Sequence, residues 1–191
     1  MEDKIRICDL YKSFGAKKGL DGVDIDVQKG EIVCIVGKSG SGKSVIMKHL
    51  VGIIKPDQGE IFVDGVNYTA AKETARREIE AKYGILFQGA ALFDSMNVYD
   101  NVAFGLRRKK VPEDEIRGIV SAMLEQVGLR DVEEKMPGEL SGGMQKRVGL
   151  ARSIAMKPDI MIYDEPTTGV DPITGGAVDR LILKMREQFG I

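Results

Sequence analysis

The sequence predicts an α/β fold with a mainly parallel sheet, and two observations support this prediction. The first is the segment Gly37–Ser44, which matches G-x-x-x-x-G-K-[ST], the pattern of a phosphate-binding loop between a strand and a helix. The apolar run 32–36 before it is expected to be that strand, and a helix-compatible segment, 44–51, follows it. The second is the alternation of strand-like and helix-like segments along the chain. We expect one domain over residues 1–191, with an N-terminal antiparallel β-subdomain and a helical subdomain inserted over about 89–158.

Composition describes an ordinary globular protein. The chain has 191 residues, 43% of them hydrophobic and 30% charged, which is enough to bury a substantial core. A net charge of −1 gives no overall basic field that would attract nucleic acid. No apolar segment approaches the roughly 20 residues that span a bilayer, and no N-terminal signal region is visible. Cys8 and Cys34 are expected to be small buried side chains, not a disulfide or a metal site.

Alternating patterns predict the antiparallel sheet. Residues 4–10 and 23–27 alternate apolar and polar side chains, as half-buried strands do, with a loop over 13–19 between them. Another strand, 60–63, follows a turn at 56–59. These strands would form a sheet beside the phosphate-loop core.

Buried strands and amphipathic helices follow. Residues 69–82 are rich in helix formers, and 84–87 and 160–163 are short buried strands. Pro112 can open an amphipathic helix that Gly128 ends. A further amphipathic helix is predicted from the turn at Asp171-Pro172 to Gly190.

The phosphate loop supplies the first candidate binding residues. Its glycines let the backbone wrap around a triphosphate with N–H groups pointing inward, and the following helix adds its positive end. Lys43 can reach the β- and γ-phosphates, and the Ser44 hydroxyl is placed to bind Mg²⁺. The candidate nucleotide-binding residues of this loop are Gly37, Lys38, Ser39, Gly40, Ser41, Gly42, Lys43 and Ser44.

Polar residues at two strand ends are candidates for metal binding and catalysis. Asp164 follows a hydrophobic strand, where a carboxylate can hold Mg²⁺ opposite Ser44. The adjacent Glu165 is placed to polarise the water that attacks the γ-phosphate. Gln88 follows another buried strand, and its amide could reach Mg²⁺ or that water. With Lys43, Glu165 and Gln88 are the candidate catalytic residues.

A second anion-binding end is predicted at residues 140–147 (LSGGMQKR). Ser141, Gly142 and Gly143 would offer one hydroxyl and bare backbone N–H groups at a helix start. One active site does not need two such ends from one chain. In the simplest arrangement, each subunit lends this end, including Met144, to the nucleotide of a second copy.

These motifs resemble the ATP-binding subunit of an ABC transporter, over essentially the whole chain. Residues 140–144 resemble the family's signature sequence, and Gln88 resembles the glutamine of its Q-loop. Asp164 and Glu165 resemble its Walker B acid and catalytic glutamate.

Two further residues are identified only through this resemblance. Phe14 is similar to the aromatic residue that stacks on adenine, and Asp171 lies in a stretch that resembles the D-loop. The resemblance implies a P-loop NTPase core, ATP and Mg²⁺ as cofactors, and ATP hydrolysis. It also implies a head-to-tail homodimer with ATP between the copies, an integral-membrane permease as partner, and a cytoplasmic location on the inner face of the cell membrane.

A finer resemblance concerns the transported substrate. Met144 stands where most of the family has Gln, and segments 86–98 and 171–174 are similar to the ATPases of Mla-type, MCE-associated phospholipid transporters. This resemblance implies lipid transport across the bacterial envelope and an MCE-type lipid-binding protein as a further partner. An importer of amino acids or other small solutes remains the alternative.

The chain departs from the family at its C-terminus. Such ATPases carry a switch histidine after a strand that would begin where this chain ends. The only histidine, His49, is expected to be a packing or surface residue. We therefore expect a truncated ATPase, and a nucleotide-binding module with impaired hydrolysis is the alternative for this chain.

Other classes fit the sequence less well. ABC ATPases of DNA repair or chromosome organisation insert a long coiled coil between the Q-loop and the signature, but only 52 residues separate Gln88 from Ser141 here. A GTPase would show an Asn-Lys-x-Asp motif, which is absent, and a small-molecule kinase would not explain residues 140–144. The basic run 107–110 is expected in a solvated loop, with contact to anionic lipid headgroups as the alternative.

Overall fold

The computed structural model describes residues 3–191, which form two compact units. Unit 1 comprises residues 3–83 together with Ile191, and unit 2 comprises Gly84–Gly190. No helix in the described part of the chain is long and apolar enough to cross a membrane.

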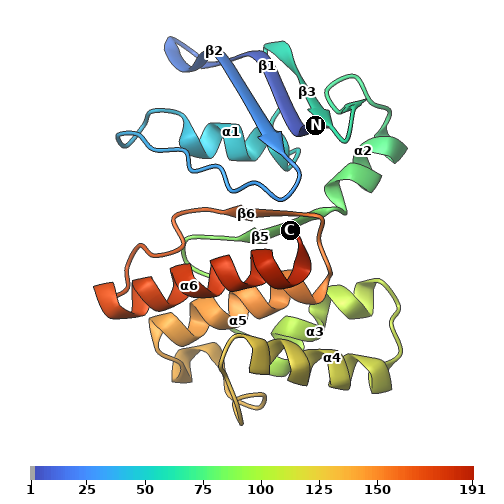
Figure 1. Cartoon of the computed structure of the whole chain (residues 1–191), viewed down its shortest axis with the longest axis vertical. Coiled ribbons are helices and arrows are strands. Elements are labelled where there is room, and N and C mark those ends of the chain that lie inside the picture. Colours follow the sequence, from blue (N-terminus) through green and yellow to red (C-terminus); the bar gives the residue numbers. More distant parts are fainter. Residues whose placement is uncertain (1–2) are drawn as a thin grey trace. The chain divides into compact units, whose positions relative to one another are not determined.

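Unit 1 is built on a four-stranded antiparallel sheet of order β2-β1-β3-β4 (Figure 1). Its strands are β1 (Asp3–Phe14), β2 (Lys17–Gln28), β3 (Gln58–Val63) and β4 (Val66–Asn67). β1 is paired on both sides, because Ile7 lies opposite Ile25 of β2 and Ile61 of β3. The predicted antiparallel sheet is confirmed. The loop expected over 13–19 is mostly strand, since the hairpin turns within Gly15 and Ala16.

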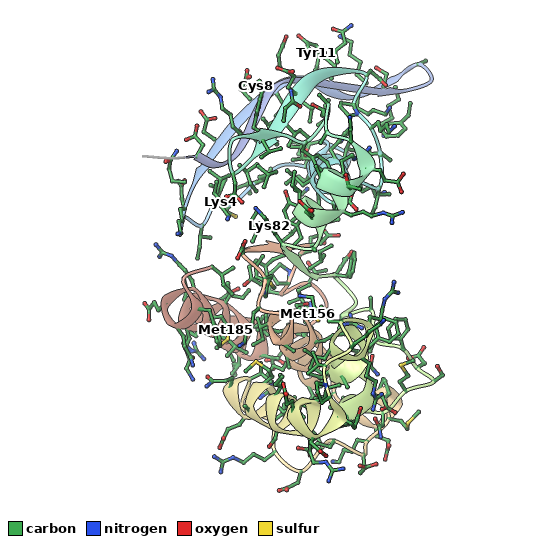
Figure 2. The ribbon with its side chains drawn as sticks, turned by 90° about the vertical axis from the view of Figure 1, so that its right-hand side faces the viewer. Lys4, Cys8, Tyr11, Lys82, Met156 and Met185 are labelled. Carbon is green, nitrogen blue, oxygen red and sulfur yellow. The ribbon has the colours of Figure 1, made fainter. Side chains whose placement is uncertain are left out.

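Two helices accompany this sheet, α1 (Lys43–Leu50) and α2 (Glu73–Glu80). The apolar side chains buried in unit 1 come from the sheet, both helices and the β4–α2 connection: Ile5, Ile7, Leu10, Leu20, Ile46, Ile61, Val63, Tyr68 and Ile79. At one end of the sheet, Asp64 forms ion pairs with Lys4 and Lys82, both of which are labelled in Figure 2.

Two expectations for unit 1 are wrong. Residues 31–38 form no strand and are exposed, and Cys34 is exposed where a buried side chain was expected. An apolar run forms a strand only if another strand pairs with its backbone, and no such pairing is present in residues 3–191 for this segment. Cys8 lies in β1 and is half-buried.

The helix expected over residues 69–82 is shorter, because α2 begins at Glu73. The Asn67 side chain accepts hydrogen bonds from the Thr69 hydroxyl at 2.7 Å and the Ala70 N–H at 3.0 Å. This side-chain turn competes with helix formation over the first residues of the segment.

Unit 2 combines a two-stranded parallel sheet with four α-helices (Figure 1). The elements are β5 (Tyr83–Leu86), α3 (Val98–Arg108), α4 (Glu113–Gln126), the 3₁₀ turn η1 (Pro137–Glu139), α5 (Gly142–Ala155), β6 (Ile160–Tyr163) and α6 (Pro172–Phe189). Pro112 precedes α4 and Gly128 follows it with a φ of 70°, as predicted. Asp171 and Gly190 bound α6, also as predicted. The α/β fold class is therefore confirmed.

The core of unit 2 is organised around α5, which packs against α3, α4 and α6. Met185 of α6 is fully buried in this core (Figure 2). Met156, just after α5, packs over Gly105 of α3 so closely that a Cβ on this glycine would lie 2.5 Å from the Met156 sulfur. Methionine thus fills core space here.

Candidate nucleotide-binding site

The phosphate loop, residues 37–44, lies in unit 1 and runs directly into α1. Gly40 and Gly42 have φ angles of 80° and 100°, in the left-handed region that glycine adopts without strain. The Ser41 N–H donates to the Lys38 carbonyl at 3.1 Å and closes the turn. No side chain caps the N-terminus of α1. The loop therefore ends at the positive, uncapped end of a helix, which suits a phosphate group.

Two of the loop glycines leave no room for a Cβ beside a neighbouring atom. A Cβ on Gly42 would lie 2.5 Å from the carbonyl oxygen of Gly19 in β2. A Cβ on Gly37 would lie 2.5 Å from the Ser41 hydroxyl oxygen. A larger residue at position 42 would force the loop to move, whereas one at position 37 would require the Ser41 side chain to turn away.

The side chain of Lys43 arches back over the phosphate loop. Its ammonium group donates to the carbonyls of Gly37 at 2.8 Å and Lys38 at 3.3 Å. Ser44, the next residue of α1, is exposed. The loop thus carries an ammonium group and a hydroxyl at the helix end, and these groups fit the phosphates of a nucleotide.

Phe14 lies at the end of β1 and is 49% exposed, as a stacking platform requires. A Cβ on Gly19 would lie 3.0 Å from its ring, and the Gly19 carbonyl is the group that Gly42 approaches. The aromatic ring and the phosphate loop therefore both lie against Gly19. Asp57 holds the strand end, because it accepts hydrogen bonds from the Lys12 ammonium and the Ser13 N–H, both at 2.7 Å. These bonds lower the pKa of Asp57.

His49 is a packing residue of α1, in line with the expectation. Its side chain is 1% exposed, and Nδ1 donates to the Val45 carbonyl at 2.7 Å. Burial lowers the pKa of the imidazole. The neutral form is therefore favoured inside unit 1.

Asp164 and Gln88 follow neighbouring strands of unit 2. The Asp164 N–H donates to the Leu86 carbonyl at 2.9 Å, so the residue after β6 lies beside the end of β5. Gln88 is exposed two residues beyond Leu86, and Asp164 is half-buried. The structure brings these candidate Mg²⁺ ligands to the same edge of the sheet. Their carboxylate and amide oxygens are hard donors, the type that Mg²⁺ prefers.

Glu165 has a strained backbone. Its φ of 46° lies in the left-handed region, which is uncommon for a residue with a side chain. The exposed carboxylate accepts a hydrogen bond from the Thr168 hydroxyl at 3.2 Å, and the Thr168 N–H donates to the Glu165 carbonyl at 3.1 Å. Strain of this kind persists only where the surroundings hold it, and it collects at functional sites.

The predicted second anion-binding end forms the start of α5. Ser141 is the N-cap, and its Oγ accepts from the Met144 N–H at 3.3 Å. The hydroxyl hydrogen stays available to donate to a ligand. A Cβ on Gly143 would lie 2.4 Å from Cγ2 of Thr174, so only glycine lets α5 approach α6 here. Gly142 is exposed.

Asp171 caps the neighbouring helix, α6. It accepts hydrogen bonds from the N–H groups of Ile173 and Thr174, both at 3.0 Å. Hydrogen bonds from the Thr174 side chain and backbone hold the pKa of Asp171 below its usual value. Because Thr174 also contacts Gly143, the structure brings Asp171 close to the start of α5.

The turn after Gln88 depends on a residue that sequence analysis missed. Ala90 and Ala91 have φ angles of 59° and 47°, both left-handed. Arg152 of α5 donates to their carbonyl oxygens at 2.8 Å each, and burial lowers its pKa. Without knowledge of its partner carbonyls, an arginine in a sequence is expected to be a solvated cation. No sequence signal therefore indicated the role of Arg152.

Asn101 of α3 was also missed. It is fully buried, and its Oδ1 accepts from the Phe93 N–H at 2.8 Å. Its Nδ2 faces the carbonyls of Phe93 at 3.1 Å and of Met96 and Asn97 at 3.0 Å. A polar residue between the buried positions of an amphipathic helix was the available signal.

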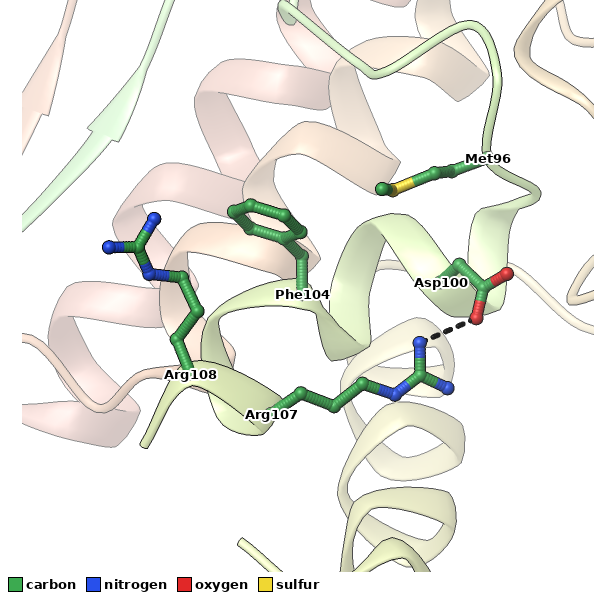
Figure 3. A pocket seen from close by; sticks show the side chains of 5 residues that line it. All are labelled: Met96, Asp100, Phe104, Arg107 and Arg108. Carbon is green, nitrogen blue, oxygen red and sulfur yellow. Dashed lines mark hydrogen bonds and ion pairs between the residues drawn. The ribbon is translucent and has the colours of Figure 1, made fainter. Parts of the chain in front are cut away.

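A hollow of about 390 Å³ lies on the surface of α3 (Figure 3). Its lining residues are Met96, Asp100, Phe104, Arg107 and Arg108. Arg107 is neutralised locally by ion pairs with Asp100 at 2.7 Å and Glu113 at 2.9 Å. The basic run 107–110 is exposed, as expected, but its first two residues lie in the last turn of α3 and not in a loop.

The candidate residues thus form two groups. Phe14 and residues 37–44 lie in unit 1, and the group in unit 2 comprises Gln88, Ser141, Gly142, Gly143, Met144, Asp164, Glu165 and Asp171. Each group carries side chains of the types that bind a nucleotide or its metal ion.

Comparisons with known proteins place these groups in a family. A family model described as ABC transporter matches residues 20–168. The probable ribonucleotide transport ATP-binding protein mkl of Mycobacterium leprae is 44% identical over 186 residues, 97% of this chain and 54% of that protein. The intermembrane phospholipid transport system ATP-binding protein MlaF of Haemophilus influenzae is 40% identical over 191 residues, 100% of this chain and 72% of that protein.

Relatives with other names are almost as similar. The methionine import ATP-binding protein MetN of Carboxydothermus hydrogenoformans is 41% identical over 174 residues, 91% of this chain and 52% of that protein. The chain therefore spans about half the length of several curated relatives that it matches.

Solved structures agree with the sequence relatives. CbiO1 from Clostridium perfringens, part of the ABC transporter complex cbiONQ, matches with a TM-score of 0.91 and 31% identity, over 100% of this chain and 76% of that one. The ATP-binding cassette MJ0796, in a dimeric post-hydrolysis state bound to ADP and Pi, matches with a TM-score of 0.86 and 29% identity, over 97% of this chain and 84% of that one. The chain therefore belongs to the ABC transporter family, as an ATP-binding domain.

Proposed function

We propose that this chain is the ATP-binding and ATP-hydrolysing subunit of a membrane transporter. The observation that carries the proposal is the presence on one chain of a phosphate loop, with Lys43 arched over it, and a second helix start, capped by Ser141, that can hold an anion. In the proposal, Lys43 and the loop N–H groups hold the triphosphate, and the exposed Phe14 ring stacks on adenine.

The polar residues at the strand ends would complete the site. Ser44, Asp164 and Gln88 would hold Mg²⁺ through their oxygen atoms, and the bound ion would neutralise charge on the phosphates. Glu165 would accept a proton from the water that attacks the γ-phosphate. Its carboxylate is exposed, and the Thr168 hydroxyl holds its direction.

Two copies would face head to tail, with ATP between residues 37–44 of one copy and Ser141–Met144 of the other. The dimeric state of the similar cassette MJ0796 supports this arrangement. The Ser141 hydroxyl would donate to the γ-phosphate, with Asp171 close to the same surface. Because that contact needs the γ-phosphate, hydrolysis would remove the interaction that holds the dimer closed.

The cargo proposed for the transporter is phospholipid, moved across the bacterial envelope. The similarity to MlaF over the whole chain supports this proposal, together with the Met144-containing signature. The chain would act at the inner face of the cell membrane, bound to an integral-membrane permease and accompanied by an MCE-type lipid-binding protein. The surface from Gln88 to the hollow on α3 would receive the permease.

Purification of the complete natural protein from its native membranes in mild detergent would test this proposal. Mass spectrometry of the purified complex should identify a permease and an MCE-type protein, and the complex should hydrolyse ATP. Lys43→Ala should abolish hydrolysis without changing the partners. A solute-binding protein in place of the MCE-type protein would favour import of small solutes, as in the relative named MetN. Soluble partners alone would contradict transport altogether.

A further inference from the structure

Lys146 is a buried cation that the proposed mechanism does not use. It lies on α5, one turn beyond Gly143, and is only 5% exposed. Lysine is almost never fully buried unless its ammonium group has partners. Burial lowers the pKa of Lys146, whereas the nearby Glu165 carboxylate acts in the opposite direction. The position therefore needs an explanation beyond a solvated helix face.

The partners of Lys146 lie in the turn that follows Asp164 and Glu165. Its Nζ donates to the carbonyl oxygens of Pro166 and Thr168, both at 2.6 Å. These carbonyls lie on either side of Thr167, so one ammonium group spans the turn. Charge-assisted hydrogen bonds of this kind are stronger than neutral ones and fix the positions of both acceptors.

The same turn determines where the Glu165 carboxylate points. The backbone of Glu165 is left-handed, with a φ of 46°, and its carboxylate accepts from the Thr168 hydroxyl at 3.2 Å. Thr168 is therefore bound through its carbonyl to Lys146 and through its hydroxyl to Glu165. A strained backbone persists only where the surroundings fix it, and Lys146 supplies one such restraint from α5.

We propose that Lys146 is a positioning residue for ATP hydrolysis, which holds the Glu165–Thr168 turn and so aims the Glu165 carboxylate from the helix that begins at Ser141. The inference rests on the proposed function of Glu165 as the base. Under this inference, the direction of the Glu165 carboxylate depends on α5. The start of the same helix would bind the nucleotide of the other copy. Small displacements of a catalytic group lower a rate strongly, because reaction needs alignment.

The test compares two variants in the complete natural protein. Lys146→Met keeps a long, unbranched side chain but no donor, and Lys146→Gln keeps N–H donors without the charge. We expect Lys146→Met to lower kcat by about tenfold or more, with KM and the Kd for ATP within about twofold of the unchanged protein. Lys146→Gln should recover a large part of that loss. Lys184→Met, at an exposed position of α6, is the matched control and should leave both constants unchanged.

A third variant changes Thr168, on the other side of the turn. Thr168→Val removes the hydroxyl that binds Glu165 at an exposed position, where folding is not at risk. It should also lower kcat while leaving KM unchanged. If Lys146→Met does not fold, the result from Thr168→Val together with that from Lys146→Gln decides the proposal. An unchanged kcat in Thr168→Val, or the same loss in Lys146→Gln as in Lys146→Met, would overturn it.

ATP-dependent dimerisation separates positioning of Glu165 from support of Ser141. In a Glu165→Gln background, Lys146→Met should still form the dimer with ATP, because the anion-binding start of α5 is intact. Loss of the dimer would show that Lys146 supports Ser141 instead, and would overturn the inference while the proposed function stands. Absence of ATP hydrolysis in the unchanged complex would instead reject the proposed function and, with it, this inference.

Discussion

The Nη2 atom of Arg152 donates a hydrogen bond of 2.8 Å to the carbonyl oxygen of Ala90. The Nη1 atom of the same guanidinium group binds the next carbonyl, that of Ala91, at 2.8 Å. Both alanines have left-handed backbones, two and three residues after Gln88. The helix that starts at Ser141 is therefore tied near its other end to the turn that carries Gln88.

Replacing Arg152 tests how much this tie stabilises unit 2. Arg152→Met keeps much of the apolar stem but leaves both carbonyls without their donor, so we expect the free energy of unfolding to fall by about 3 kcal/mol. Arg130→Met is the matched control, because Arg130 is exposed and its ion pair with Glu125 lies on the surface. Its effect should stay below about 1 kcal/mol. Chemical denaturation measures both, and equal losses would contradict the role of Arg152.

In the left-handed turn after Gln88, replacing an alanine with glycine should raise the free energy of unfolding, although this substitution usually lowers it. Ala91 has a φ of 47° and is exposed, so glycine would relieve strain without leaving a cavity. We expect Ala91→Gly to raise the free energy of unfolding by roughly 0.5 kcal/mol. Ala122→Gly, at an exposed position within α4, should lower it by about 1 kcal/mol. If both substitutions lowered it equally, the turn would not be strained.

Protonation of the Glu113 carboxylate should make the fold less stable in acid. Its carboxylate accepts hydrogen bonds from the Arg107 guanidinium and the Tyr99 hydroxyl, which lower its pKa to about 2 from an ordinary value of 4.5. A depressed folded-state pKa stabilises the fold above the unfolded value, and this contribution is lost as the pH falls from about 4.5 to about 2. The free energy of unfolding should therefore fall less steeply over this range in Glu113→Gln. Denaturation at a series of pH values measures this slope, and a slope in Glu113→Gln equal to that of the unchanged protein would contradict the prediction.

The elements that sequence analysis predicted best are those whose signals are local. Pro112 and Gly128 bound α4, and the alternation in β1 and β2 predicted an antiparallel pair. These signals work because proline, glycine and a two-residue period restrict the backbone directly. The phosphate-loop pattern likewise specifies its own geometry, including the left-handed Gly40 and Gly42.

The features that sequence analysis missed depend on partners far away in the chain. Residues 32–36 are apolar but form no strand, because strand formation needs a second backbone. Lys146 and Arg152 look like surface cations, yet both donate to carbonyls of distant segments. The left-handed backbones of Ala90 and Glu165 have no sequence signal either, since neither residue type favours that region.

The close approach of Gly42 to the Gly19 carbonyl should make nucleotide binding sensitive to a side chain at position 42. Gly42→Ala would place a Cβ 2.5 Å from the Gly19 carbonyl and force a side chain into a φ of 100°. We expect the Kd for ATP to rise by at least about tenfold, because the loop must move away from the strand that bears Gly19. The control is Gly65→Ala, which places a side chain at a φ of 74° with open space around the Cβ. It therefore imposes backbone strain without a collision. Its Kd, measured with a fluorescent ATP analogue, should stay unchanged.

Glu165→Gln in the complete natural protein tests the proposed cycle. The amide keeps the size of the side chain but cannot accept the proton of the attacking water, so ATP should bind without being hydrolysed. Because the γ-phosphate then persists, the contact with Ser141 of the other copy persists too, and size-exclusion chromatography with light scattering should detect a stable dimer in ATP. Adding Ser141→Ala should weaken this dimer while leaving the Kd for ATP of the single subunit within about twofold. A Glu165→Gln protein that stays monomeric in saturating ATP, with normal nucleotide affinity, would contradict the head-to-tail arrangement.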